Sequence, residues 1–351
     1  MKITHIHIER FRGFQNEDFE VGSLLTAIAG QNGTQKSTLL GIITQTFTLK
    51  TEDSMRVEKP LCGGSYISAF KDKFRLSPTF DKPKGHEWTI SFDAGMDDFT
   101  VESIKRTGDP NVRFWKKGAR QEGDGYISFP TIFLSLKRLV PVAEEAKIIT
   151  DDTLLTQEEL NEFKQLHNKI LIAQTPISSA TTITSKNKQS IGVSTELYDW
   201  NQNSMGQDNL GKIILALFSF KRLHDKYPRQ YKGGILAIDE MDATMYPASQ
   251  VELLKVLRKY ASKLNLQILF TTHSMSLLKA MDDLVQEVTK KEETANQAKI
   301  LYLKKVDDKI AIKQGVNFKG IQLDLNVVAE GNNRKKNRIT AYTEDKENIL
   351  F

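Results

Sequence analysis

The chain has 351 residues, of which 39% are hydrophobic and 26% charged, and its formal net charge is +5. At about 150 residues per domain, this length predicts two domains or one large α/β domain with insertions, and the composition excludes a disordered chain. Cys62 is the only cysteine, which excludes an internal disulfide framework and a cysteine-based zinc site. There is no signal-peptide pattern and no apolar run of the roughly 18 residues that a membrane span needs. We therefore expect a soluble cytoplasmic protein with no membrane contact, whose mild positive charge permits contact with nucleic acid without requiring it.

The first 130 residues or so are predicted to form a β-rich lobe. Residues 5–8 alternate between histidine and isoleucine, which is typical of a strand, and the apolar run at 23–29 predicts a buried strand that stops at Gly30. Residues 87–117 hold two more alternating stretches separated by turn residues, which favours an antiparallel β section. The apolar run at 131–136 predicts another buried strand.

A helical insertion is expected at about 141–200. Thr156 and Glu159 form a capping-box pattern, and apolar residues follow it at helical spacing. Residues 174–195 are rich in serine and threonine and are interpreted as a loop or an edge strand.

The segment from about 201 to 330 is predicted to alternate between helices and strands and to complete one large domain that spans residues 1–330. We expect helices at 210–223 and 251–264, strands at 235–238 and 267–270, and a hairpin within 300–312. Residues 331–351 are expected to be a basic, charged tail or the start of a truncated domain.

The first candidate site is a phosphate-binding loop at residues 30–37, between the strand at 23–29 and a helix that is expected to start at Ser37. A glycine-rich turn between a strand and a helix points backbone N–H groups at phosphates; Lys36 would reach the β- and γ-phosphates and Ser37 would hold Mg²⁺. Gln35 stands where the second glycine of this motif belongs, and a side chain there would weaken nucleotide binding or hydrolysis. The alternative is an ordinary strand-to-helix turn with an exposed lysine. The predicted nucleotide-binding residues of this loop are Gly30, Asn32, Gly33, Gln35, Lys36, Ser37 and Thr38.

Three further motifs carry candidate chemistry, and each has a plain structural alternative. Asp239 and Glu240 follow a predicted strand, where the aspartate would support Mg²⁺ and the glutamate would activate water, although two carboxylates after a strand also occur by chance. Ser204 and Gly206 precede a helix, where they would form an anion site or only a helix cap. His273 follows a short buried strand and is either catalytic or structural.

These motifs occur in the chain order Walker A, signature, Walker B, D-loop and switch histidine. In this order the chain resembles the ATP-binding-cassette ATPases, and specifically the SMC/RecF-type and OLD-like ATPases, labelled AAA, of DNA repair and phage defence. Residues 11–14 (Phe-Arg-Gly-Phe), the signature segment at 203–207 with Ser204, Gly206 and Gln207, the D-loop at 242–247, and residues 271–274 (Thr-Thr-His-Ser) match that family's motifs. The resemblance covers about residues 1–315.

The resemblance implies an α/β P-loop NTPase of ABC-ATPase type, with an antiparallel β lobe and a helical insertion. It implies that two copies sandwich two ATP molecules, as a homodimer or a higher homo-oligomer. Glu240 would polarise the attacking water, His273 would contact the γ-phosphate, and Asp239 would share Mg²⁺ with Ser37. The signature residues would face the ATP of the other copy.

Two positions depart from the pattern or leave alternatives open. Arg12 is a candidate phosphate or adenine-side contact, or only a surface arginine. The glutamine of the family's Q-loop has no match, and Lys137 and Arg138 occupy its neighbourhood.

The resemblance leaves the task of the ATPase open. Only about 165 residues separate Ser37 from Ser204, which excludes a long-armed SMC protein. The leading hypothesis is an ATP-binding sensor and scaffold of an antiphage system, acting with a separate nuclease or toxin. A RecF-like DNA-repair ATPase and a scaffold that hardly turns over ATP are the alternatives. The basic residues at 334–338 slightly favour nucleic acid, and residues 343–345 resemble an acidic strand end of a nuclease domain that this chain would lack.

Overall fold

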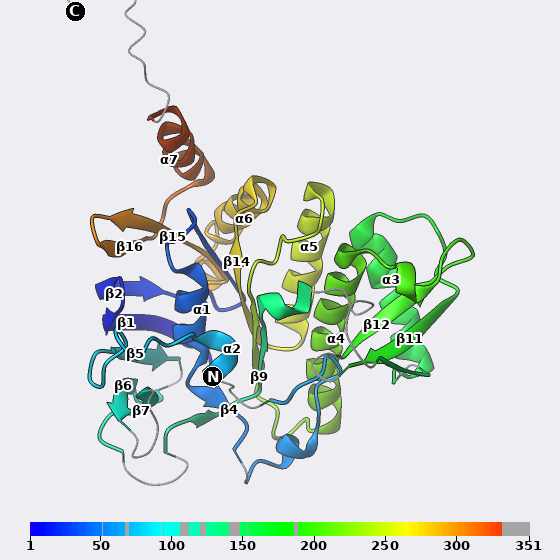
Figure 1. Ribbon diagram of the computed structural model, residues 1–351, viewed down its shortest axis with the longest axis horizontal. Helices are drawn as coiled ribbons and strands as arrows, with labels where there is room; N and C mark the ends of the chain where they lie inside the picture. The colour runs from blue at the N-terminus through cyan, green and yellow to red at the C-terminus, as the bar shows by residue number, and fades with distance from the viewer. Residues whose placement is uncertain are drawn as a thin grey trace, which may run out of the picture. The chain divides into compact units, whose positions relative to one another are not determined.

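The computed structural model describes residues 1–50, 52–66, 70–93, 95–105, 112–119, 124–139, 148–152, 154–185 and 189–331. The chain divides into two compact units, Met1–Val316 and Asn317–Phe351, so the first unit ends before the predicted boundary near 330. In the second unit the described part is helix α7 (Phe318–Gly331) (Figure 1). The basic cluster and the acidic strand end expected beyond residue 331 lie outside the described residues.

A five-stranded antiparallel sheet forms the β-rich lobe, with the strand order β2-β1-β5-β6-β7. Its strands are β1 (Ile3–Phe11), β2 (Phe14–Glu20), β5 (Glu87–Phe92), β6 (Phe99–Lys105) and β7 (Val112–Lys116). The antiparallel section that the alternation predicted at 87–117 is confirmed, but it also contains β6, whose alternation we did not detect. In β6, Phe99, Val101 and Ser103 are buried while Thr100 and Glu102 between them are half-buried, which is the pattern of a strand covered on one face.

A six-stranded sheet lies at the centre of the first unit, in the order β16-β15-β3-β14-β13-β9. Five of its strands are parallel to their neighbours, and β16 pairs antiparallel with β15. The strands are β3 (Leu25–Gly30), β9 (Thr131–Leu134), β13 (Gly234–Ile238), β14 (Leu266–Thr272), β15 (Ala298–Val306) and β16 (Lys309–Lys313). β3, β13 and β14 are buried along their whole length, which explains why they were recognisable as continuous apolar runs. The predicted strands and hairpin of this sheet are confirmed.

Helices pack against the strands of the six-stranded sheet. α1 contacts β3, β13 and β14, α5 contacts β14, and α6 contacts β3 and β15. Their bounds, with that of the long signature helix α4, are α1 (Lys36–Thr44), α4 (Met205–Lys226), α5 (Pro247–Lys263) and α6 (Met275–Val288). One hydrophobic core joins both sheets through α1, and includes Ile8, Trp88, Leu39, Leu269 and Leu301. No helix in the described ranges is long and apolar enough to cross a membrane.

The insertion was predicted to be helical with a loop or an edge strand at 174–195, and it holds more strands than that prediction included. It contains α3 (Gln157–Leu171) and a three-stranded antiparallel sheet, β10 (Ile149–Asp152), β11 (Ser179–Thr184) and β12 (Gln189–Ser194). The Ser/Thr-rich stretch forms strands because its few apolar residues, among them Ile183 and Val193, are buried against the rest of the unit. The capping box of Thr156 and Glu159 is confirmed. Figure 1 shows β11, β12 and α3 on the opposite side of α4 from the antiparallel sheet.

Short elements connect these parts. They are β4 (Phe47–Thr48), which pairs with β8 (Ile127–Ser128), helix α2 (Phe70–Lys73), and the 3₁₀ turns η1 (Ser54–Val57), η2 (Leu136–Leu139), η4 (Trp200–Gln202) and η5 (Glu292–Thr294).

Candidate functional site

The carboxyl ends of four parallel strands bring the candidate residues to one edge of the six-stranded sheet. The phosphate loop follows β3, Asp239 and Glu240 follow β13, His273 follows β14, and Arg138 follows β9. Ligands of open α/β sheets bind at this edge, because loops from distant parts of the chain converge there. Ser37 Oγ donates a hydrogen bond to Asp239 Oδ1 at 2.8 Å, so residues about 200 positions apart share one site.

The phosphate loop has the backbone of a loop that surrounds an anion. Asn32 and Gly33 are exposed at its tip, while Thr34 closes a turn by bonding the carbonyl oxygen of Gln31 through its Oγ1 at 2.8 Å. Lys36 Nζ donates to the carbonyl oxygens of Gly30 and Gln31, both at 2.9 Å. The ammonium group therefore lies inside the curve of the loop, beside the backbone that would surround a phosphate.

Gln35 adopts the conformation that a glycine normally supplies at this position. Its φ of 63° is left-handed, and it serves as the N-cap residue of α1. Its side chain is directed to the β1–β2 turn, where a Cβ on Gly13 would lie 2.7 Å from Gln35 Nε2 and 2.7 Å from Ile310 Cγ1. Gly13 is therefore the residue that makes room for this glutamine, and the Gln35 side chain packs against that turn.

Asp239 is held by hydroxyl groups from two other elements. It is 5% exposed, and its Oδ1 accepts hydrogen bonds from Ser37 Oγ and from Thr271 Oγ1, the latter at 2.7 Å. The same Thr271 hydroxyl accepts the backbone N–H of Glu240 at 2.6 Å. Thr271 thus fixes the orientation of one carboxylate and the start of the turn that carries the other.

The charges at this edge influence one another. Burial lowers the pKa of Lys36 to about 8, although Glu240, Asp239 and Asp242 act in the opposite direction. The pKa of His273 is lowered by burial and by the positive charge of Lys36. His273 is therefore a neutral imidazole near pH 7, able to donate one hydrogen bond without adding a charge.

The signature residues are bonded mainly within their own segment. Ser204 Oγ accepts the N–H of Gln207 at 3.3 Å, Gln207 Oε1 accepts the N–H of Ser204 at 2.8 Å, and Gln207 Nε2 donates to the hydroxyl of Tyr198 at 2.7 Å. This is the helix cap that we named as the structural alternative. Ser204 is nevertheless exposed. Gly206 is buried against the D-loop, where a Cβ would lie only 2.6 Å from the carbonyl oxygen of Thr244.

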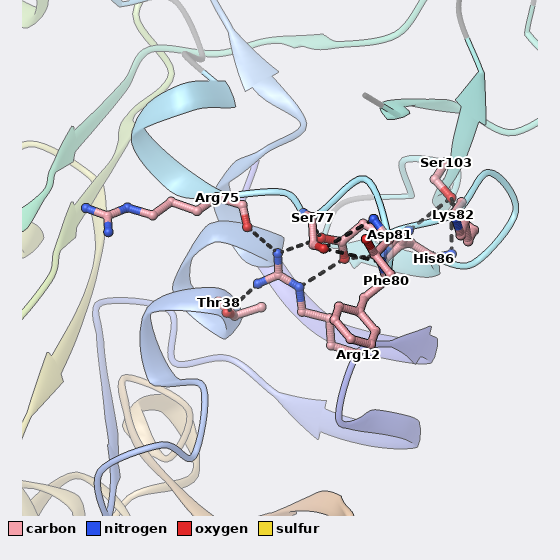
Figure 2. A network of polar contacts seen from close by, with 10 residues as sticks. Arg12, Thr38, Arg75, Ser77, Phe80, Asp81, Lys82, His86 and Ser103 are labelled. Carbon is pink, nitrogen blue, oxygen red and sulfur yellow. Dashed lines mark hydrogen bonds and ion pairs between the residues drawn. The ribbon is translucent and has the colours of Figure 1, made fainter. Parts of the chain in front are cut away.

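Arg12 is held beside the phosphate-loop helix by a buried polar network (Figure 2). Its Nε and Nη2 donate to the two oxygens of Asp81, each at 3.1 Å, and Nη1 lies 3.5 Å from Thr38 Oγ1. Asp81 Oδ1 in turn bonds His86 Nε2 at 3.0 Å. Burial acts to raise the pKa of Asp81, but the hydrogen bond from Arg12 and the backbone N–H of Ser77 outweigh it, and the pKa is lowered. Arg12 is an oriented cation and not a free surface arginine.

Ser37 and Asp239 are the residues that fit a Mg²⁺ ion. A hydroxyl and a carboxylate oxygen in contact match the oxygen ligands that Mg²⁺ prefers, and phosphate oxygens and water usually complete its shell. No group of three or more His, Cys, Asp or Glu side chains within the described ranges could hold a metal ion by itself.

Several residues of this site were missed at the level of sequence. Arg138 is 2% exposed and donates to the backbone of Asp239 and Glu240, and Asn209 bonds both Arg138 and the D-loop. Thr271 and the pair Asp81 and His86 were also missed. Of these residues, only Arg138 was noted from the sequence, as a neighbour of the place where the family's Q-loop glutamine is expected, and no role was given to it.

Comparisons with known proteins agree with this architecture. Residues 136–278 match the family model described as AAA ATPase domain, and this stretch includes the signature segment, Asp239, Glu240 and His273. No curated protein matches the chain. A solved SMC head bound to the C-winged helix domain of ScpA is 14% identical, with a TM-score of 0.53, and the match covers 92% of this chain and 100% of that one.

Two other solved heads are similar at lower TM-scores. The SMC head domain from Thermotoga maritima is 14% identical with a TM-score of 0.48, covering 90% of this chain and 100% of that chain. An Smc head domain with an extended coiled coil, bound to the C-terminal domain of ScpA derived from Pyrococcus furiosus, is 13% identical with a TM-score of 0.48, covering 93% and 99%. The chain therefore has a mixed α/β P-loop NTPase fold that resembles the SMC head, with a five-stranded antiparallel sheet and a mainly parallel six-stranded sheet.

Proposed function

We propose that this chain binds ATP with Mg²⁺ and hydrolyses it slowly, as an ABC-type ATPase that closes in pairs around two ATP molecules. The observation that carries the proposal is the hydrogen bond between Ser37 and Asp239, with Lys36 inside the adjacent loop. A P-loop lysine, a hydroxyl and a strand-end aspartate at one point are the parts that position the phosphates and the Mg²⁺ of a nucleotide.

The residues around this point divide the work of hydrolysis. Lys36 would bind the β- and γ-phosphates, and Ser37 with Asp239 would hold Mg²⁺, which neutralises phosphate charge when bound. Glu240 follows Asp239 directly and would take a proton from the attacking water. His273, neutral for the reasons given above, would donate a hydrogen bond to the γ-phosphate.

Dimerisation around ATP is supported by the exposure of the signature segment. Ser204 and Met205 are exposed at the start of α4, and Tyr246 of the D-loop is 49% exposed. Within one chain the hydrogen bonds of Ser204 described above run to Gln207. These residues are therefore accessible to the γ-phosphate bound by a second copy, as the family resemblance implies.

The proposal also includes a slow rate of ATP hydrolysis and a biological role. Slow turnover follows from Gln35, which must hold a left-handed backbone at a place where glycine does so at lower cost. From the resemblance to compact SMC/RecF-type and OLD-like ATPases we propose that the ATP-dependent clamp scaffolds or regulates a separate nuclease or toxin in antiphage defence. Direct binding of DNA, as in a RecF-like repair ATPase, is the alternative.

Nucleotide binding by the full chain tests the core of this proposal. We expect Mg²⁺-dependent binding of ATP that Lys36→Ala weakens by at least about 100-fold, since the variant loses the phosphate-binding cation. Lys279→Ala, which changes an exposed lysine of α6, is the matched control. If wild-type protein and Lys36→Ala bind ATP equally, the proposal is wrong.

Two measurements distinguish regulation of a separate effector from direct binding of DNA. Co-expression with the product of the neighbouring reading frame, followed by assay of nuclease or toxin activity with and without ATP, tests the regulated effector. DNA affinity between 50 and 200 mM salt tests the repair alternative, because binding to the DNA backbone falls steeply over this range. An affinity that does not fall excludes direct contact with the DNA backbone.

A further inference from the structure

Arg138 lies between the turn that begins with Asp239 and Glu240, called the catalytic turn below, and the signature helix α4. It is 2% exposed, and its guanidinium group makes five hydrogen bonds to groups of the protein. Nη1 donates to the carbonyl oxygen of Asp239 at 2.5 Å, and Nη2 donates to the carbonyl oxygen of Glu240 at 2.7 Å. The remaining Nη1 contacts, with Leu134 and Ser135, fasten the group to the end of β9.

The turn that Arg138 holds is strained. Glu240 has φ 50°, and Thr244 at the other end of the same segment has φ 69°. Left-handed backbone is uncommon for residues other than glycine and is an outlier for a β-branched threonine. Such conformations persist only where the surroundings over-determine them. Arg138 supplies this restraint at Glu240, together with the Thr271 hydroxyl on the Glu240 N–H.

Asn209 extends the connection to the signature helix. It is fully buried in the first turns of α4, and its Oδ1 accepts from Arg138 Nε at 2.7 Å. Its Nδ2 donates to the carbonyl oxygen of Ala243 at 2.9 Å. The D-loop also packs directly on the signature through Thr244 and Gly206, as described above. A continuous set of contacts therefore joins the catalytic turn, the D-loop and the start of α4.

Arg138 keeps its positive charge although it is buried. Burial lowers its pKa to about 10, while Asp239, Glu240 and Asp242 act to raise it, so the group stays protonated at neutral pH. Each of its three nitrogens donates to a carbonyl oxygen or to Asn209, and the side chain is 2% exposed, so it acts on nucleotide chemistry through other residues. Lysine could not replace it, because an ammonium group lacks the planar fork that reaches Asn209 and two carbonyl oxygens at once.

We infer that Arg138 is a positioning residue that fixes the Asp239–Glu240 turn and, through Asn209, couples it to the signature helix. The part of this inference that concerns turnover rests on the proposed ATPase function. In this arrangement, a shift of the catalytic turn on nucleotide binding is transmitted within the same chain to Ser204 and Gly206.

Hydrogen exchange of the nucleotide-free full chain tests the positioning directly. In Arg138→Met we expect the amides of residues 239–244 and 205–210 to exchange at least about tenfold faster, because local opening becomes easier. The phosphate loop and α3 should change by less than about twofold. Arg222→Met is the matched control, since Arg222 bonds Glu159 and Leu154 away from the catalytic turn. Unchanged exchange at 239–244, or the same increase in the control, overturns the inference.

Turnover supplies the second readout. Arg138→Met and Arg138→Lys should both lower kcat by at least about 20-fold while KM for ATP stays within about threefold, because placement of Glu240 and not ATP binding is affected. Asn209→Ala should lower kcat too, and the double variant should lose less than the product of the two single effects. Independent, multiplicative effects contradict the coupling.

The two assays separate failure of this inference from failure of the proposed function. If the wild-type protein binds no ATP, the proposed function is wrong, and exchange still decides whether Arg138 holds the turn. If Arg138→Met does not fold, Asn209→Ala in the exchange assay decides: faster exchange at 239–244 supports the inference, and unchanged exchange contradicts it.

Discussion

Ser37 and Asp239 lie in contact, with the Ser37 hydroxyl donating to Asp239 Oδ1 at 2.8 Å, although they come from opposite parts of the chain. Parallel pairing of β14 with both β3 and β13 is what brings them together. This pairing places the candidate nucleotide site at one edge of the six-stranded sheet, and we expect substitutions around this contact to affect nucleotide chemistry before they affect the fold.

Glu240→Gln should separate ATP binding from hydrolysis. The amide keeps the size of the side chain and leaves the backbone bonds to Thr271 and Arg138 intact, but it cannot accept a proton from water. We expect turnover to fall by at least about 100-fold and ATP to remain bound. Light scattering with ATP should then show a stabilised dimer or higher assembly.

The control for this prediction is Glu252→Gln, which changes a carboxylate of α5 that pairs with Lys255 on the surface. It should leave both turnover and assembly unchanged. Turnover of Glu240→Gln equal to that of the wild-type protein would remove Glu240 from the catalytic role.

Gln35→Gly should raise turnover a few-fold while ATP affinity stays within about threefold. The affinity is insensitive because the Gln35 side chain packs on the β1–β2 turn at Gly13. Turnover rises because glycine holds the left-handed backbone without strain and lets the loop adjust to charge that develops on the phosphates. Equilibrium binding and phosphate release measure the two quantities; a fall in both would show that the contact between Gln35 and Gly13 has a positive function.

Much of the scaffold of this protein was predictable from its sequence, and the reason is physical. The strands ending at Gly30, Ile238 and Thr272 are buried on both faces, so they appear as uninterrupted apolar runs, and each is followed by a polar motif. The capping box at Thr156 was recognisable because it depends on local spacing alone. Local signals therefore located both the strands of the sheet and the candidate nucleotide-binding residues at its edge.

The parts that were missed depend on long-range contacts. Asp81 orients Arg12 across 69 residues, and Asn209 bonds Arg138 across 71, and no local pattern marks either pair. The sheet of the insertion was anticipated only as a loop or an edge strand at 174–195, because Ser and Thr residues hide the alternation of buried Ile183 and Val193. Gln35 was located correctly, but only the structure shows that its side chain packs against Gly13.

Asp81→Asn should weaken ATP binding through Arg12. The amide cannot pair with the guanidinium group as a carboxylate does, so Arg12 loses its fixed orientation beside Thr38. We expect KM for ATP to rise about three- to tenfold with a smaller change in kcat, and the free energy of unfolding to fall by about 1–3 kcal/mol, because Asp81 is buried. Asp18→Asn, at an exposed carboxylate that pairs with His5 and His7, should change neither quantity. An unchanged KM in Asp81→Asn would mean that Arg12 is only structural.

His167 should make the protein sensitive to acid. It is 2% exposed on α3, and burial lowers its pKa to about 4, although a side-chain contact with Asn168 acts to raise it. The unfolded chain, with an ordinary histidine pKa of about 6.5, binds the proton more readily, so stability falls as the pH drops from about 6.5 to about 4. Once the pH is below about 4, protonation of His167 should have lowered the free energy of unfolding by about 3 kcal/mol in total.

Urea unfolding between pH 4 and 7 measures this dependence, with His167→Leu as the test variant and His224→Gln, at a half-exposed histidine of α4, as the control. His167→Leu should flatten the slope of unfolding free energy against pH. The slope that remains should reflect the other groups with lowered pKa values, among them His86, His273 and the carboxylates of Asp81 and Glu159. The control should keep the wild-type slope, because His224 lies on the half-exposed side of α4 beside Asp225 and away from the buried face of α3. A slope unchanged in His167→Leu would show that α3 admits water or a proton to His167 without unfolding.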